Sequence, residues 1–344
     1  GQQGDQAQQG EQQMEEQGQQ ETITLTYAFF APKWTFPGKQ MQEWVREIEK
    51  RTDGRVQVET HYGGSLLGAK EMYSGVRDGV ADIGLGFPGY DPSQFPVLSV
   101  FSLPLKIPNA MVGSLTYWDI IREYDPESLD DFKVIAAFTT EPAYIQSQEP
   151  IRSLEDLKGK KLRTRGAAIP TAKALGMSPV GMPMPQVPES LQKGVISGLV
   201  TSREVIKDFK LAPNIQYVTD YSMDVGYFAA VMNKQKWNSL PPDVKQEINA
   251  LRREMSVWTA AYHQWVNVRD ALAWARQKHG LEIVDLEEGQ REKWDRRIEN
   301  QVIDDWVEQA EGAGAPAQEI LNRVKELRDH YNKTWEREFA SMEE

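Results

Sequence analysis

The first part of the chain alternates between strand-like and helix-like patterns of apolar residues. The segment TITLTYAFF alternates polar and apolar positions and then turns wholly apolar, as a strand does when it runs into a buried core. Residues 36–54 follow with an apolar stripe at helical spacing that ends at Gly54. RVQVET, GAKEMYSGVRDG and ADIGLGF then have the patterns of a strand, a helix and a strand. This β-α-β-α-β order predicts a mostly parallel sheet with helices on both faces.

A second unit of the same kind begins after the strand-like segment KVIAAF. It comprises a capped helical turn at Ser153, the strand KKLRTR, helices around TAKALG and VPESLQKGVISG, and a strand over residues 226–233. Two such units, joined by strands that pass between them, predict two lobes with a cleft. Ligands of such sheets bind beyond the carboxyl ends of the strands.

The C-terminal third has a helical pattern. Apolar residues keep helical spacing from Pro242 to Gly280, which predicts a helix on the order of 50 Å long. A helix of that length would overrun one small domain, so we expect it to brace both lobes. LEIVDL predicts a last short strand, and two amphipathic helices separated by GAGAP follow it.

The first twenty residues consist almost entirely of Gln, Gly and acidic residues. They have too little apolar surface to offset the entropy of ordering, so residues 1–21 are expected to form a disordered tether. Two interpretations remain open: a tolerated disordered tail, or a spacer behind a lipid-modified cysteine that was removed together with a signal peptide.

Composition narrows the classes of function. The chain has 39 Lys and Arg against 51 Asp and Glu, a net charge of −12, which argues against nucleic acid as a partner. It contains no cysteine, which excludes thiol catalysis, disulfides and cysteine-based zinc sites. No apolar run approaches the roughly 20 residues that span a bilayer.

The usual signatures of catalysis are missing from the sequence. The four histidines have no partners at metal-ligand spacing, and there is no GxSxG elbow, P-loop or GxGxxG after a strand. In HYGGSLLGAK, turn formation explains Gly63 and Gly64 better than anion binding does. Asp130 and Asp131 lie in a solvated stretch and do not support a carboxylate dyad. We therefore expect no enzyme, no metal and no cofactor.

Four segments in order resemble the solute-binding subunits of tripartite ATP-independent periplasmic (TRAP) transporters, the DctP-like family. They are HYGGSLLGAKEMYSGVRDGVADIGLG, IRSLEDLKGKKLRTR, ALGMSPVGMPMPQVPESLQKGVISGLVTS and MNKQKWNSLPPDVKQEI. The resemblance implies a two-lobe, type II-like periplasmic-binding-protein α/β fold with hinge strands and a long helix spanning both lobes. The expected boundaries are 22–140 plus about 232–275 for lobe 1, and about 141–231 plus 276–344, with the C-terminal helices, for lobe 2.

The resemblance also implies a function. Such a protein lies outside the cytoplasm, and it is lipid-anchored if the removed-cysteine interpretation holds. It closes as a monomer on a small organic carboxylate. It delivers this ligand to the small and large TRAP membrane subunits, which use an ion gradient. The arginine of the family's KIR strand typically clamps the carboxylate; its counterpart here is Arg163, and Thr201 and Ser202 fall where polar residues complete the site.

Two departures from the family pattern affect these expectations. Ser197 stands where the family has an aspartate, so whatever that aspartate holds is held differently here. The segment EPAYIQSQEP lacks the second arginine of members that bind sialic acid, which argues against a sugar acid of that kind.

Together with the resemblance, the chemistry of the residues favours Arg163 as the carboxylate anchor over the alternative, a surface salt bridge on a strand. On KKLRTR, Lys161, Arg163 and Arg165 share one face, and cations on one face repel one another unless an anion meets them. The planar fork of an arginine binds both oxygens of a carboxylate, which a lysine cannot do. Arg165 is equally well explained as a second donor or as a solvated side chain.

Aromatic residues at predicted strand ends are candidates for the walls of the cleft. As a group they favour a ligand with an apolar or aromatic body, although packing in the core explains each one about as well. Tyr144 and Tyr227, near the expected hinge crossings, are candidates for phenol hydrogen bonds. The strand-end candidates are Phe30, Trp34, Phe87 and Tyr90.

Two functions from other classes remain open at this stage. One is an enzyme on a two-lobe scaffold, against which the missing catalytic groups speak. The other is an exported ligand sensor for a membrane receptor kinase, because lobe closure would be the same event in both proteins.

Overall fold

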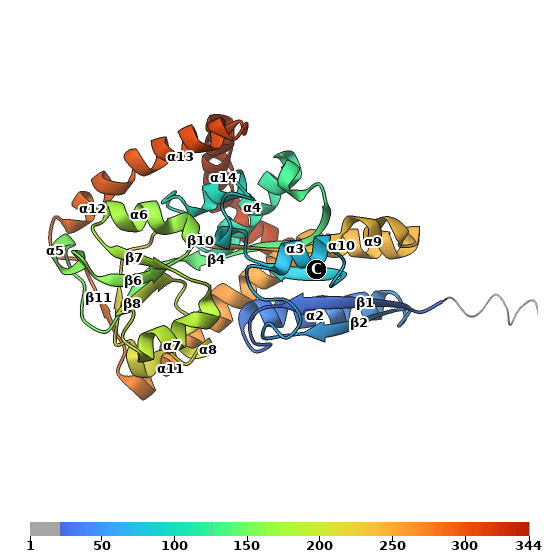
Figure 1. The fold of residues 1–344 in the computed structure, drawn as a ribbon, viewed down its shortest axis with the longest axis horizontal. Helices are drawn as coiled ribbons and strands as arrows, with labels where there is room; N and C mark the ends of the chain where they lie inside the picture. The colour runs from blue at the N-terminus through green and yellow to red at the C-terminus, as the bar shows by residue number, and fades with distance from the viewer. Residues whose placement is uncertain (1–20, 125, 344) are drawn as a thin grey trace, which may run out of the picture.

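The computed structural model describes residues 21–124 and 126–343, which fold into two α/β lobes (Figure 1). The expected tether over residues 1–21 lies outside the described residues except for Glu21. Among the described residues, no helix is both long enough and apolar enough to cross a membrane.

The sheet of the first lobe has five strands in the order β2-β1-β3-β10-β4. Strand β1 runs parallel to β2 and β3, whereas β10 runs antiparallel to β3 and β4. The sheet is therefore mixed rather than mostly parallel, because β10 returns from the second lobe and enters from the opposite end. The strands are β1 (Ile23–Phe29), β2 (Val56–His61), β3 (Ile83–Gly86), β4 (Phe132–Pro142) and β10 (Val225–Asn233), and the helices of this lobe are α2 (Phe36–Arg51), α3 (Met72–Arg77), α4 (Ala110–Tyr124) and α9 (Lys234–Ser239).

The sheet of the second lobe has six strands in the order β11-β9-β5-β8-β6-β7. Strand β6 runs parallel to β7 and β8, and β5 runs antiparallel to β8 and β9. Its strands are β5 (Tyr144–Ser147), β6 (Lys161–Thr164), β7 (Ser178–Gly181), β8 (Gly198–Thr201), β9 (Tyr217–Thr219) and β11 (Glu282–Val284), and its short helices are α5 (Leu154–Leu157), α6 (Ile169–Ala174), α7 (Val187–Gln192) and α8 (Val205–Asp208).

The chain crosses between the sheets from β4 to β5 and again from β9 to β10. The sequence-based boundaries placed residues 141–231 in the second lobe. Strand pairing instead places all of β10 in the first sheet, between β3 and β4. A strand that is apolar throughout gives no sign of which sheet it joins, so the boundary was set several residues too late.

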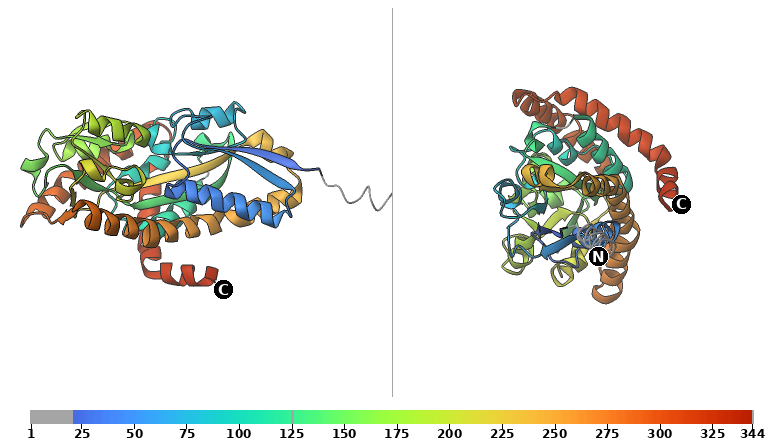
Figure 2. Two further views of the ribbon diagram at one scale, coloured as in Figure 1. Left: turned by 90° about the horizontal axis from the view of Figure 1, so that it is seen from below. Right: turned by 90° about the vertical axis from the view of Figure 1, so that its right-hand side faces the viewer.

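One long helical segment braces both lobes, as expected (Figures 1 and 2). It consists of α10 (Pro242–Tyr262), a π-helical turn at His263–Asn267, and α11 (Val268–His279). Helix α10 packs on α2, α4 and β4 of the first lobe, and α11 packs on α8 of the second. The second lobe therefore begins to contact this segment before residue 276, where the sequence-based boundary lay.

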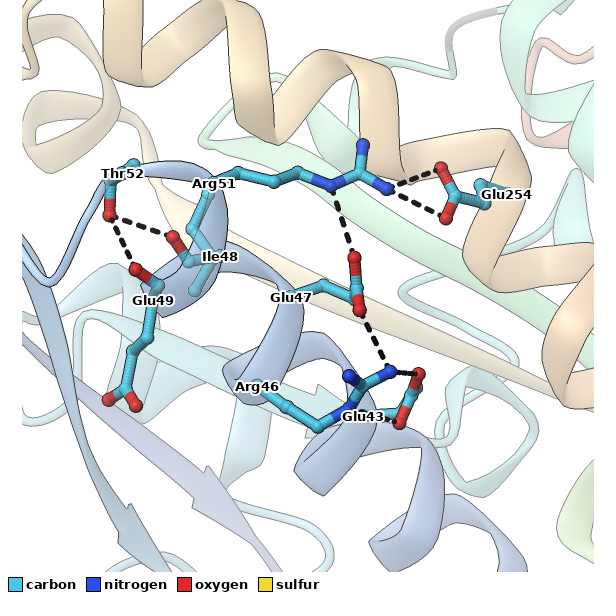
Figure 3. Close-up of polar contacts among 8 residues, drawn as sticks. All are labelled: Glu43, Arg46, Glu47, Ile48, Glu49, Arg51, Thr52 and Glu254. Carbon is cyan, nitrogen blue, oxygen red and sulfur yellow. Dashed lines mark hydrogen bonds and ion pairs between the residues drawn. The ribbon is translucent and has the colours of Figure 1, made fainter.

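Charged side chains tie α10 to the first lobe at its contact with α2 (Figure 3). One nitrogen of Arg51 donates to both carboxylate oxygens of Glu254, at 2.8 and 2.9 Å, while Nε donates to Glu47 at 3.3 Å. Glu47 in turn contacts Arg46, 2.8 Å away. These groups are partly exposed, so each pair contributes little, and the network mainly fixes the register of the two helices.

The C-terminal region contains three helices where the sequence predicted two. They are α12 (Gln290–Ile298), α13 (Gln301–Gly312) and α14 (Ala317–Glu343). The break at GAGAP separates α13 from α14 as expected, but the short interruption before Gln301 carries no Gly or Pro and was not foreseen.

Helix α14 packs on α4 of the first lobe rather than on the second lobe to which residues 276–344 were assigned. The hydroxyl of Tyr331 donates to the carboxylate of Asp119 on α4 within this contact. Helix α13 runs from α12 towards α14, so the last helix lies on the first lobe beside α4 (Figure 1).

Candidate ligand-binding site

A cavity lies between the lobes at the ends of their strands. The first lobe contributes mostly aromatic side chains, and the second contributes both arginines of KKLRTR together with polar and acidic groups. Its lining includes Phe29, Phe30, Thr35, Phe36, Phe87, Tyr90, Thr140 and Phe228 from the first lobe and Arg163, Arg165, Met184, Thr201, Ser202, Glu204, Asp208 and Phe209 from the second.

The aromatic wall is a continuous cluster of rings in mutual contact. Phe30 lies edge-on to Tyr90 with 5.7 Å between ring centroids, and Phe87 lies 4.7 Å from Tyr90 and 5.0 Å from Phe228. Of the strand-end aromatics predicted from the sequence, Phe30, Phe87 and Tyr90 therefore line one cavity.

The Gly63–Gly64 turn helps to hold this wall in place. Both glycines have positive φ, 67° and 74°, a backbone conformation that favours glycine. Their amides donate to the carbonyls of Ala31 and Phe29, which flank Phe30. The turn-forming role expected of this pair agrees with that geometry.

Arg163 is a buried cation without a protein counter-ion. It lies on β6 with 1% of its surface exposed, and its Nε donates to the carbonyl of Met182 at 2.9 Å. No carboxylate among the described residues lies within 4.0 Å of its guanidinium. Burial, assisted by the charge of Arg165, lowers the pKa of Arg163 to about 10, which leaves it positive at neutral pH.

Arg165 has its counter-ion within the protein. Its guanidinium forms a buried ion pair with Asp224 and lies 5.7 Å from the centre of the Phe87 ring. It is therefore not a solvated side chain. Its Nε is buried and has no hydrogen-bond partner within the described ranges, so it remains a candidate second donor. Burial raises the pKa of Asp224, and Arg165 opposes that rise.

Thr201 and Ser202 end β8 at the cavity, where the sequence placed them. The side-chain amide of Gln146, on the neighbouring strand β5, donates to the carbonyls of both residues at 2.9 and 3.0 Å. This contact fixes the backbone from which their hydroxyls reach the cavity. The Ser202 hydroxyl donates to Oε1 of Glu204 at 3.0 Å.

Two acidic residues of the cavity were missed by the sequence analysis. Burial raises the pKa of Glu204 well above its usual value, and the charges of Asp208 and Glu141 add to this effect. Burial also raises the pKa of Asp208 to about 6, although Asn267 donates to its carboxylate at 3.2 Å. Their spacing of four residues across a helical turn was the available signal, since it places both carboxyl groups on one face.

Three predicted site residues do not line the cavity. The side chain of Trp34 is 50% exposed. The ring of Tyr144 packs against the guanidinium of Arg203, with 4.1 Å between the guanidinium carbon and the ring centroid. Tyr227 is buried, and its hydroxyl lies 3.1 Å from that of Ser102. The sequence located the right strands and loops, but it does not show on which side of the backbone each ring lies.

Hydrogen bonds join the two lobes across the cleft. The indole of Trp34 donates to the carbonyl of Asp208 at 2.9 Å, and the amide of Met184 donates to the hydroxyl of Tyr90 at 3.0 Å. The structure is thus a closed form, in which residues of both lobes surround the same cavity. Within the described part of the chain, no group of His, Asp and Glu side chains is arranged to hold a metal ion.

Comparison with known families and structures agrees with this geometry. The profile of the bacterial extracellular solute-binding protein family 7 (DctP) matches residues 28–309, which is most of the chain. The chain belongs to this family. The two-lobe fold, the interlobe cavity and the bracing helix are accordingly those of a TRAP solute-binding protein.

Three solved TRAP solute-binding proteins illustrate the likeness. One from Desulfovibrio salexigens, 42% identical over 90% of this chain and 96% of its own (TM-score 0.80), is an open complex with the C-terminus of a symmetry mate in its ligand-binding site. One from Rhodoferax ferrireducens is 26% identical, covers 91% of this chain and 99% of its own (TM-score 0.85), and holds copurified benzoate. One from an unidentified marine microbe is specific for aromatic acids and holds 3-hydroxybenzoate. It is 28% identical and covers 91% of this chain and 99% of its own (TM-score 0.85).

Proposed function

We propose that this TRAP solute-binding protein captures a small organic carboxylate with an apolar or aromatic body and hands it to the TRAP membrane subunits. The observation that carries the proposal is Arg163, a buried guanidinium with no carboxylate within 4.0 Å among the described residues. A buried charge without a counter-ion is costly, so the site gains most from a ligand that brings a negative charge.

The neighbouring groups assign distinct roles to the two arginines. Asp224 pairs with Arg165, so of the two arginines only Arg163 has no carboxylate within 4.0 Å among the described residues, which suits a ligand that places one carboxylate there. The Nε of Arg163 is held by Met182, and Tyr90 also interacts with its guanidinium, so the group is held in position to bind the carboxylate oxygens. Thr201 would complete the shell as a hydroxyl donor, and Ser202, whose hydroxyl already donates to Glu204, would add an acceptor.

The aromatic wall supports an apolar or aromatic ligand body. Rings of Phe30, Phe87 and Phe228 offer large apolar contact area but no partners for hydroxyl groups. Benzoate and 3-hydroxybenzoate, the ligands of relatives 26% and 28% identical, fit this description. The polypeptide C-terminus in the 42% identical relative also ends in a carboxylate.

This function involves no chemical reaction on the ligand. The family to which the chain belongs consists of solute-binding proteins, which supports a binding protein rather than an enzyme. A place outside the cytoplasm follows from the role of the family, and a lipid anchor through a removed cysteine stays a proposal.

Calorimetry on substituted proteins tests the anchor. For benzoate we expect Arg163→Ala to lose about 2–5 kcal/mol of binding free energy, the usual cost of removing one partner of a buried charged pair. Arg163→Lys should lose less, because the charge remains while the two-pronged contact is lost.

Arg77→Ala is a matched control, because Arg77 forms an exposed ion pair with Asp131 far from the cavity. It should bind benzoate as the wild type does. Unchanged binding by Arg163→Ala would refute the anchor, and a larger loss in Arg165→Ala than in Arg163→Ala would move the anchor to Arg165.

A further inference from the structure

Glu204 lines the cavity and has one buried carboxyl oxygen without a hydrogen-bond partner among the described residues. The side chain lines the cavity and is 4% exposed. Its Oε1 accepts from the Ser202 hydroxyl at 3.0 Å, but Oε2 is buried and has no hydrogen-bond partner among the described residues. Nearly all buried polar atoms of proteins have a partner, so this oxygen points to one supplied by the ligand.

The two acidic residues of the cavity, Glu204 and Asp208, form no ion pair with its arginines. Neither Glu204 nor Asp208 lies within 4.0 Å of a nitrogen of Arg163 or Arg165, whereas Arg165 does pair with Asp224. Arg163 lies on β6, while Glu204 begins the helical turn that follows β8. A ligand whose two carboxylate oxygens are both held by Arg163 can meet Glu204 through a second polar group.

Building on the proposed function, we infer that the ligand is a hydroxylated acid whose hydroxyl group binds Oε2 of Glu204 while its carboxylate binds Arg163. A hydroxyl both donates and accepts, so it satisfies Oε2 whether or not that oxygen carries a proton. Asp208 is less suited to this role, because Asn267 already occupies its Oδ2.

The electrostatic surroundings favour a hydroxyl over an ammonium group. Burial, Asp208 and Glu141 all raise the pKa of Glu204, which keeps its carboxyl group neutral well above the usual range. A neutral carboxyl group gains little from a cationic partner, and a ligand cation would bear the full cost of leaving water.

Matched aromatic acids test this inference on the wild-type protein. Calorimetry would compare benzoate, 3- and 4-hydroxybenzoate, 3- and 4-methylbenzoate and 3-(aminomethyl)benzoate. A methyl group has nearly the size of a hydroxyl but cannot form hydrogen bonds. We expect one of the hydroxybenzoates to bind about tenfold more tightly than its methyl isostere, the usual value of one buried hydrogen bond.

Substitutions of Glu204 assign the preference to this side chain. Glu204→Leu should bring the hydroxyl-to-methyl affinity ratio to about one while benzoate still binds, and Glu204→Gln should retain a ratio of several-fold. Glu189→Leu, which alters an exposed glutamate of the same lobe, should leave the ratio unchanged. Melting temperatures of all variants establish that each is folded.

The outcomes separate this inference from the proposed function on which it rests. Wild-type protein that binds hydroxyl and methyl isosteres equally, or Glu204→Leu that keeps the preference, would overturn the role of Glu204 and leave the carboxylate anchor standing. A preference for the aminomethyl acid would overturn the hydroxyl assignment. Failure of all these acids to bind would overturn both proposals.

Discussion

At the scale of single residues, the two arginines of KKLRTR differ through their partners. The sequence pattern places both on one face and cannot distinguish them. The structure shows that Asp224 neutralises Arg165, while Arg163 keeps an uncompensated charge. Asp224 follows Arg165 by 59 residues, so no local pattern could have revealed the pair.

Removing Asp224 tests this division. In ligand-free Asp224→Asn the guanidinium of Arg165 would be buried without a counter-ion, so the free energy of unfolding should fall by about 3–5 kcal/mol. Benzoate should then stabilise the variant more than it stabilises the wild type, because its charge meets two uncompensated arginines.

Thermal unfolding with and without benzoate measures both effects. Asp131→Asn, which breaks the exposed pair with Arg77, should change stability by less than about 1 kcal/mol and serves as the control. A melting temperature of Asp224→Asn equal to that of the wild type would contradict the assigned pairing.

At the scale of elements, periodicity predicted most of the helices and strands, while pairing and packing decided the rest. Strand β1, helix α2 and the bracing helix follow directly from apolar spacing. The sheet of β10 and the lobe of α14 depend on contacts with distant segments, which a single sequence does not show. The site was predictable to the same extent. The sequence indicates which strand ends carry the site, but it does not show on which side of the backbone each aromatic ring lies.

The π-helical turn between α10 and α11 contains a buried histidine with pH-dependent consequences. His263 lies 4.0 Å from the ring of Phe36, and its Nδ1 is 3.2 Å from the side-chain oxygen of Asn267. Burial lowers the pKa of His263 from 6.5 to about 3, so the side chain is neutral in the folded protein. The unfolded chain binds a proton below pH 6.5 and the folded protein does not, so stability declines as the pH falls from 6.5 towards 3.

The pH dependence of the unfolding free energy should therefore differ between the wild type and a variant without His263. From pH 7.5 to 5.0, the wild type should lose about 2 kcal/mol more unfolding free energy than His263→Phe, at 1.36 kcal/mol per pKa unit. Urea unfolding at the two pH values measures the loss. His330→Gln, which alters an exposed histidine, should follow the wild type. Parallel losses in wild type and His263→Phe would show that His263 is protonated in the fold.

At the scale of the whole molecule, the site exists only because two lobes share it. The aromatic wall belongs to one sheet and Arg163 to the other, and hydrogen bonds from Trp34 and to Tyr90 are among those that join the lobes. A ligand that contacts both lobes only when they meet shifts the molecule towards the closed form. Closure therefore couples the presence of a carboxylate to a shape that membrane subunits can recognise.

The identity of the naturally bound compound tests this account most directly. Protein purified under native conditions would be denatured, and the small molecule that it releases identified by mass spectrometry, for the wild type and Arg163→Ala in parallel. We expect the wild type to release an organic acid with one carboxylate and an apolar or aromatic body, and Arg163→Ala to release little or none. A bound compound without a carboxylate, or equal amounts from both proteins, would contradict the account.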